Sequence, residues 1–203
     1  MRRLLSVAAK LAALFAGYIA AVLALRPWFM TWGATDEEIE KPLPGDEIMT
    51  RGPSSIHAIT IEAPRADVWK WLVQIGQDRA GFYSYSLFEN VFRADIHNAD
   101  RIVPEWQNVQ QGDFIRLASK ERYGDFPLLR VAAIKKEHYL VLERWGAFVL
   151  EEIDPATTRL IIRSHEGNPL GGRFLNTLFW EPAHFIMEMG MLHGIKKRAE
   201  RVV

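Results

Sequence analysis

The chain has 203 residues, 49% of them hydrophobic and 25% charged, so it is long enough to bury one substantial core and a short extra segment. Its 25 basic residues balance 25 acidic residues, and this formal net charge of zero argues against a nucleic-acid partner. It contains no cysteine, which excludes disulfides, thiolate nucleophiles and cysteine-based zinc sites.

An apolar run occupies residues 4–25 and is interrupted only by Ser6, Lys10 and Gly17. As a helix it would be roughly 33 Å long, which matches the hydrocarbon core of a bilayer. Trp28, Phe29 and Trp32 follow it, where an aromatic belt at a membrane interface is expected. We therefore predict a membrane helix in an anchor that comprises residues 1–32.

The charges around this helix predict its orientation. Arg2, Arg3 and Lys10 precede its uninterrupted apolar part, whereas Arg26 alone follows it. The positive-inside rule then places the N-terminus in the cytoplasm and the bulk of the chain outside it. A signal peptide cleaved after Ala24 is the alternative, although no polar region precedes that site. A core helix is a third reading, less favoured because the run is apolar on all sides.

Residues 33–49 are predicted to form an acidic linker. Their central part, DEEIEKPLPGDE, holds two prolines and one glycine and offers little apolar area, so it is not expected to order itself. Ile39 and Leu43 are its candidates for docking on the domain, which we predict to comprise residues 50–203.

The domain opens with a strand and a helix. His57, Ile59 and Ile61 alternate with Ile56, Ala58 and Thr60, as in a strand over residues 56–62. Pro64 suits the first turn of a helix, because its missing N–H costs nothing there. The apolar residues that recur at helical spacing after it are Val68, Trp69, Leu72 and Ile75.

The connection over residues 77–107 interleaves polar and aromatic residues. Ser84 is a candidate N-cap for a short helix within it. In one reading its aromatic residues are core and its polar ones satisfy loop backbone. In the other, the connection covers one mouth of a cavity and supplies its walls. The second reading gives the candidates Tyr83, Tyr85, His97, Asn98 and Trp106.

Five further segments have strand character and are joined by short turns, which predicts an antiparallel meander. They are residues 113–118, 128–135, 138–144, 147–153 and 158–165. A glycine-containing break follows at 167–172. The last segment, 173–203, has an apolar stripe at helical spacing and a basic end, and Pro182 either kinks its helix or opens it.

The phrases ITIEAPRADVWKWLVQIG, at residues 59–76, and FWEPAHFIMEMGMLHGIKKRAE, at 179–200, resemble membrane-associated proteins of the START-related SRPBCC superfamily. This resemblance covers most of residues 50–200. It implies an α+β helix-grip fold, with a curved antiparallel sheet of about six strands around a long C-terminal helix. It also implies a cavity for a lipid, isoprenoid or polyketide-like ligand, but not one particular reaction.

Two residues outside the connection complete the predicted cavity wall. Arg163 shares a strand face with Ile161, and a guanidinium there needs a carboxylate of the protein or an acidic ligand head as its partner. His184 lies on the terminal helix, between Glu181 and Glu188 at helical spacing. This set resembles half of a carboxylate-bridged metal site, and one copy is too few, so we predict neither a metal nor a cofactor.

These observations leave two classes of function and a third possibility in which the domain binds no ligand. The first class is a membrane-anchored binding or transfer module for a small hydrophobic ligand. The second is a cofactor-free cyclase or dehydratase in which a histidine or tyrosine acts as general acid or base. The third reading is a structural domain with a filled core. The sequence has no G-x-S-x-G motif and no phosphate-binding loop, and it leaves the oligomeric state open.

Overall fold

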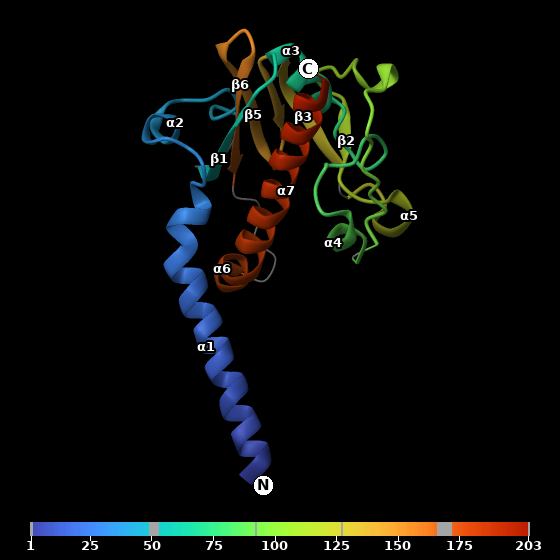
Figure 1. Cartoon of the computed structure of the whole chain (residues 1–203). Coiled ribbons are helices and arrows are strands. Elements are labelled where there is room, and N and C mark those ends of the chain that lie inside the picture. Colours follow the sequence, from blue (N-terminus) through green and yellow to red (C-terminus); the bar gives the residue numbers. More distant parts are fainter. Residues whose placement is uncertain (1, 49–52, 92, 127, 166–171, 203) are drawn as a thin grey trace.

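The computed structural model (Figure 1) has an α+β fold in which a six-stranded antiparallel sheet packs against a long C-terminal helix. It describes residues 2–48, 53–91, 93–126, 128–165 and 172–202. The domain start predicted near residue 50 and most of the break predicted at 167–172 lie outside these described residues.

The six strands agree with the six predicted from alternation and turn signals. Their order in the sheet is β1-β6-β5-β4-β3-β2, so β2 to β6 form a meander and the first strand pairs with the last. All pairs are antiparallel. The strands are β1 (Pro53–Ile61), β2 (Phe114–Arg116), β3 (Leu128–Lys135), β4 (Tyr139–Leu142), β5 (Gly146–Asp154) and β6 (Thr157–His165).

One face of the sheet, which we call the inner face, carries the main core. Ile61, Phe148 and Ile162 are fully buried there with Leu192 and Ile195 of helix α7 (Glu181–Ala199). Burying one such side chain stabilises the fold by roughly 1.5–3 kcal/mol. Figure 1 shows α7 lying across this face of the sheet, and the helix contacts β1 and α3.

The helix predicted after Pro64 is α3 (Arg65–Val73), and it buries Val68 and Trp69 in the main core. The prediction that Ser84 caps the next helix is wrong. That helix begins at Ser86, and the Ser84 hydroxyl donates instead to the carbonyl oxygen of Met187 in α7 at 2.7 Å. The short helices after α3 are α4 (Ser86–Val91), η1 (Pro104–Trp106) and α5 (Lys120–Tyr123).

The C-terminal helical segment changes its hydrogen-bonding pattern where proline requires it. Pro182 has no N–H, so the carbonyl of Leu178, four residues earlier, has no α-helical donor. The N–H of Glu181 donates to the carbonyl of Asn176, five residues back, and the hydroxyl of Tyr18 in α1 donates to the free Leu178 carbonyl. The elements are α6 (Gly172–Leu175), the π-helical turn η2 (Asn176–Trp180), α7 and η3 (Glu200–Val202).

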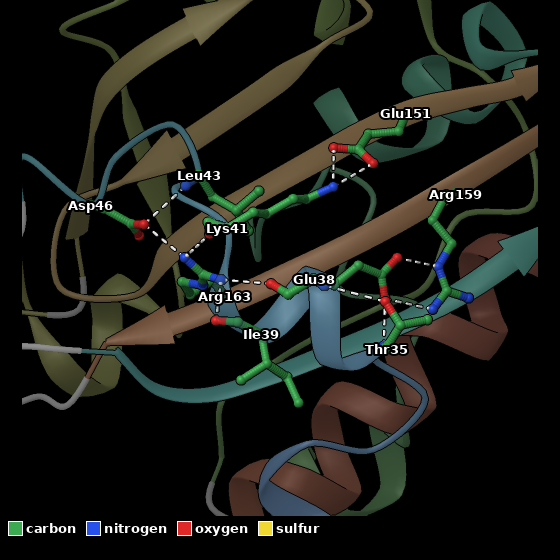
Figure 2. A network of polar contacts seen from close by, with 9 residues as sticks. All are labelled: Thr35, Glu38, Ile39, Lys41, Leu43, Asp46, Glu151, Arg159 and Arg163. Atoms are coloured by element: carbon green, nitrogen blue, oxygen red, sulfur yellow. Dashed lines mark hydrogen bonds and ion pairs between the residues drawn. The ribbon is translucent and has the colours of Figure 1, made fainter.

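The opposite, outer face of the sheet is covered by residues 31–46, most of which were predicted to be an unordered linker (Figure 2). Helix α2 (Asp36–Glu40) starts with a capping box between Thr35 and Glu38. Leu43 docks as expected and is buried against Val141, Ala147 and Ile161 of the sheet. A polar segment is ordered here because its backbone and carboxylates meet two arginines of β6.

Arg163 is one of these arginines, and its position corrects the prediction that it lines a cavity. Its guanidinium donates to the carbonyls of Glu38, Ile39 and Lys41 and to the carboxylate of Asp46, at 2.7–3.1 Å (Figure 2). Of the two kinds of partner that were expected, a protein carboxylate or an acidic ligand head, the structure has the protein carboxylate. The face was misjudged because residues 33–49 were predicted to be a solvated linker, from which only Ile39 and Leu43 were expected to dock, whereas residues 31–46 cover this face.

Arg159, four residues earlier on the same face of β6, makes the second connection. It donates to both carboxylate oxygens of Glu38 at 2.7 and 2.9 Å (Figure 2). It also donates to the carbonyl of Gly33. Burial alone would raise the pKa of Glu38, but the hydrogen bonds from Arg159 and Thr35 and the positive charge of Arg159 lower it below its usual value. Glu38 is thus held as an ionised partner of the sheet.

Helix α1 (Arg2–Met30) projects away from the domain (Figure 1). Over Ser6–Met30 it is long and apolar enough to cross a membrane, and it is mostly exposed, although a signal sequence near an N-terminus passes the same test. Its last turns nevertheless pack on the domain. Val22 and Phe29 are buried against Leu178. Arg26 forms a bidentate ion pair with both carboxylate oxygens of Glu181, at 2.6 and 3.0 Å.

Candidate functional site

A cavity of about 850 Å³ lies between the inner face of the sheet, the first half of α7 and the connection after α3. This volume falls in the range of about 300–1,000 Å³ that is typical of small-molecule sites. Helix α1 contributes to the cavity through Phe29 and Met30. The other walls are mainly apolar and include Phe82, Leu129, Trp145, Phe185 and Met191.

One wall carries a buried polar cluster centred on Glu188, which is only 2% exposed. The Ser164 hydroxyl donates to its carboxylate, with oxygen–oxygen distances of 3.2 and 3.3 Å. Nε2 of His184, one turn earlier on α7, makes a short hydrogen bond to it. Nδ1 of His57 in β1 lies 3.6 Å from it. The Glu188 carboxylate is thus surrounded by three polar side chains, which come from two strands and a helix.

His57 connects this cluster to the end of α1. Its Nε2 donates to the carbonyl of Phe29 at 2.7 Å, because a carbonyl oxygen can only accept. Phe29 lies in the last turn of α1, where helix carbonyls have no partner within the helix. A buried chain of contacts therefore runs from the last turn of α1 through His57 to Glu188 of α7.

The charges of the cluster are coupled. Burial alone would raise the pKa of Glu188, but the charge of His184 and the hydrogen bond from His184 lower it to about 2. Burial alone would lower the pKa of His184, but the Glu188 carboxylate raises it above its usual value. Protein surrounds this imidazole, yet 43% of its side chain stays exposed because it faces the hollow of the cavity. Glu188 and His184 are thus held as an ion pair.

The geometry does not form a hydrolytic relay. In a Ser-His-Asp triad the serine and the carboxylate contact opposite nitrogens of the imidazole. Here Ser164 Oγ, at 3.4 Å, and Glu188 both lie at Nε2 of His184. Nδ1 of His184 makes no hydrogen bond with any residue that the structure describes. This nitrogen is therefore left for a bound ligand as a donor or as an acid–base group.

Glu89 of α4 is a second titratable group in the cavity wall. Its Oε2 is buried without a hydrogen-bond partner among the described residues, and burial raises the pKa of this carboxyl to about 7. At neutral pH it is present in both protonation states, as is typical of a group that exchanges protons or meets a polar ligand.

Of the seven predicted cavity residues, only His184 lines the cavity. Tyr83 is buried in the core, where its hydroxyl donates to the carbonyl of Trp71 at 3.0 Å and accepts from Gln74 at 2.9 Å. Asn98 accepts from the N–H of Tyr83 and donates to the carbonyl of Ser84, at 2.7 and 2.8 Å. These two follow the alternative reading, in which the connection consists of core aromatics and satisfied loop backbone.

The other connection residues also lie outside the cavity wall. The side chain of His97 is 82% exposed and pairs with Asp95, Tyr85 is half exposed against Phe88, and Trp106 packs partly buried on the main core. The connection does reach the cavity, through the apolar residues Phe82, Phe88 and Ile96 and through the polar residues Ser84 and Glu89.

Sequence reasoning missed His57, Ser164 and Glu89, and it assigned no ligand role to Glu188. A signal existed for His57, because it shares the face of β1 with Ile59 and Ile61 and is therefore a polar residue on a core-facing row. Ser164 shares the corresponding row of β6 with Leu160 and Ile162, but serine is too common on strands to be singled out.

The arrangement of titratable groups does not point to a metal. Among the described residues, no group of three or more histidine, aspartate or glutamate side chains has the geometry to hold a metal ion. Glu181, part of the pattern considered from the sequence, is turned to Arg26 and also accepts from Asn176 at 3.1 Å. Only the pair His184 and Glu188 remains of that pattern.

No protein-family model matches the chain, and no curated protein matches it in sequence. The solved structures that are similar to the chain include two bacterial proteins. The protein SSP2350 from Staphylococcus saprophyticus is 15% identical, with a TM-score of 0.44, and the match covers 73% of this chain and 92% of that protein. A conserved protein of unknown function from Enterococcus faecalis, EF2215, is 14% identical, with a TM-score of 0.37 and coverage of 72% and 82%.

Proposed function

We propose that this protein is a membrane-anchored module that binds or transfers a small hydrophobic ligand. The observation that carries the proposal is the cavity of about 850 Å³, with mainly apolar walls and one polar cluster around Glu188. Such a combination suits a molecule with an apolar body and a small polar head. The chain order of strand, helices, strands and terminal helix supports a helix-grip domain of the SRPBCC type as the scaffold.

The anchor in this proposal is α1. Its exposed apolar length fits a bilayer, and its charge asymmetry favours a cytoplasmic N-terminus with the domain on the other side. Arg26, Phe29 and Tyr18 contact the domain, and removal of the helix by a signal peptidase after Ala24 would break the Tyr18 contact with Leu178. These contacts support a helix that is retained in the mature protein.

The polar head of the ligand is assigned to His184. Its raised pKa favours an imidazolium that donates from Nδ1 into the cavity, while Glu188 fixes the ring. An oxygen acceptor on the ligand, such as a carboxylate, phosphate or carbonyl, meets this donor. The ligand's apolar part then lies among Phe82, Trp145 and Phe185.

Native mass spectrometry of the purified full chain, released from detergent, tests the proposal. A co-purifying hydrophobic molecule is the expected result. Ala183 of α7 lines the cavity, so Ala183→Trp should fill the space and displace that molecule. Ala156→Trp, in the exposed β5–β6 turn, is the matched control and should leave the occupancy unchanged. Equal occupancy in wild type and Ala183→Trp, or an empty cavity throughout, would refute ligand binding here.

A second candidate, a cofactor-free acid–base enzyme, is favoured by the His184–Glu188 pair and by Glu89 in the same cavity. Two titratable groups with shifted pKa values in one cavity are the usual arrangement for proton transfer. The co-purified ligand separates the two candidates. An enzyme converts it on incubation and loses this conversion in His184→Gln, whereas a binding module returns the molecule unchanged.

A further inference from the structure

One group of exposed large apolar side chains of the domain lies beside α1. In the helical segment 172–180, which comprises α6 and η2, Phe174 is 66% exposed, Phe179 45% and Trp180 41%. A water-facing helical surface seldom carries such a density of large apolar groups. Figure 1 shows α6 at the end of the domain from which α1 projects, and α1 contacts η2 directly.

Two contacts fix the depth of this segment relative to α1. The Arg26 guanidinium, the first charge after the apolar run, pairs with Glu181 at the start of α7. The Tyr18 hydroxyl reaches the carbonyl of Leu178. Tyr18 lies seven residues before the end of the apolar run at Leu25, which is about 10 Å along a helix axis. If residues 4–25 span the bilayer, Leu178 is held below the membrane surface.

The chemistry of segment 172–180 suits that depth. Trp180 and Phe179 are of the types that gather at membrane interfaces, and Arg173 can extend its charge to the headgroups along its own apolar stem. Arg26, also near the end of the apolar run, is neutralised by Glu181 rather than left unpaired in a poorly hydrated place.

The same segment forms the rim of the cavity. Asn176, Phe179 and Trp180 line it from η2, and Ile186, 49% exposed, lines it from α7. On the other side the rim includes Phe88 of α4, which is 57% exposed. The residues of segment 172–180 that would contact acyl chains therefore also lie where a ligand would enter the cavity.

We propose that segment 172–180 is a second membrane contact, inserted at the boundary of headgroups and acyl chains, and that it opens the cavity to the leaflet on the domain's side. The ligand is then a bilayer lipid that enters sideways, with its polar head at His184. The lipid identity of the ligand rests on the proposed function, whereas the insertion of the segment rests on the contacts with α1.

The absence of cysteine makes the test direct, because one introduced cysteine is then the only thiol. Phe179→Cys and Phe174→Cys in the full chain carry a nitroxide, and the protein is reconstituted in phosphatidylcholine vesicles. Collisions of the nitroxide with oxygen, which partitions into lipid, are compared with collisions with a water-soluble nickel chelate. Leu14→Cys, in the exposed middle of α1, is the lipid reference, and Ile153→Cys, 58% exposed on β5, is the water reference.

We expect the oxygen-to-nickel ratio at both test positions to exceed that at Ile153 several-fold and to approach that at Leu14. Ratios equal to that at Ile153, while Leu14 reports lipid, would overturn the inference. That outcome would leave ligand binding untouched, since Ala183→Trp tests it separately. A water-like ratio at Leu14 would overturn the inference too, because α1 would then not span the vesicle bilayer.

Discussion

Arg163 of β6 donates from Nη1 to the Asp46 carboxylate at 2.7 Å, and 117 residues of chain separate the two. The same guanidinium donates to the carbonyls of Glu38, Ile39 and Lys41 (Figure 2). All of these acceptors belong to one segment, residues 31–46, which crosses the outer face of the sheet. The side chain of Arg163 is 4% exposed. This contact fastens residues 31–46 to the outer face of the sheet and leaves the inner face for the cavity.

Replacing Arg163 by methionine should destabilise the fold by about 3–5 kcal/mol, because a partly buried carboxylate and three carbonyls lose their donor. Denaturant unfolding of the full chain in detergent measures the loss. Arg130→Met is the matched control, since Arg130 is also a strand arginine but forms an exposed pair with Glu143 at 3.3 Å. Its replacement should cost less than about 1 kcal/mol. Similar losses in the two variants would contradict a structural role for Arg163.

Truncation should show that residues 31–49 belong to the folding unit. A chain of residues 31–203 keeps the partners of Arg159 and Arg163, whereas a chain of 50–203 loses them and exposes the apolar cluster under Leu43. We expect the shorter chain to be less stable by more than the cost of Arg163→Met, about 3–5 kcal/mol. Thermal unfolding of the two fragments compares them. Equal midpoints of thermal unfolding would contradict this prediction and support a domain boundary at residue 50, as predicted from the sequence.

The glycine at position 194 should not tolerate a side chain. An added Cβ would lie 2.1 Å from the carbonyl oxygen and 2.6 Å from the Cβ of Tyr83, so α7 and the connection would have to separate. Gly194→Ala should destabilise the fold by roughly 1–3 kcal/mol, as overpacking does. Gly17→Ala, where nothing lies within 4 Å, is the helical control and should show no loss. Circular dichroism on heating distinguishes the two, and an unaffected Gly194→Ala would mean that the close approach is loose.

The elements of the sheet were predictable because alternation and turn residues are local. The face that each strand buries was not, since both faces of β6 carry apolar and polar residues. Leu160 and Ile162 face α7, whereas Ile161 and Arg163 face residues 31–46. A buried arginine on the second face needs a partner, and the sequence does not say that the partner is a carboxylate 117 residues away. The error over Arg163 followed from treating an acidic segment as solvated.

The candidate site was predictable only where its residues share one helix. His184 and Glu188 are one turn apart on α7, so their pairing follows from helical spacing. His57 and Ser164 come from the two strands that the antiparallel closure of the sheet brings together, a pairing between the first and last strands. No local pattern reports such a pairing. The aromatic and polar residues of the connection were chosen for their type, and type alone does not separate a cavity wall from a satisfied loop.

Glu89 should make stability depend on pH in a direction opposite to that of an ion-paired carboxylate. Its pKa is raised to about 7 by burial, so the folded state binds its proton more tightly than the unfolded state does. Below about pH 4.5 both states are protonated and the burial costs little. Between about 4.5 and 7 the stability should fall as the pH rises, and above 7 the full cost remains, up to about 3 kcal/mol.

Glu89→Gln removes this cost, because the amide is neutral at every pH. We therefore expect the variant to match the wild type at pH 4 and to be more stable by up to about 3 kcal/mol at pH 8. Denaturant unfolding at the two pH values measures the difference. Glu105→Gln, an exposed carboxylate in η1, is the control and should give no gain that grows with pH, since its carboxylate stays in water in both states. A Glu89→Gln variant that is less stable than the wild type at pH 8 would mean that a positive partner stabilises the ionised carboxylate, which the unpaired Oε2 argues against.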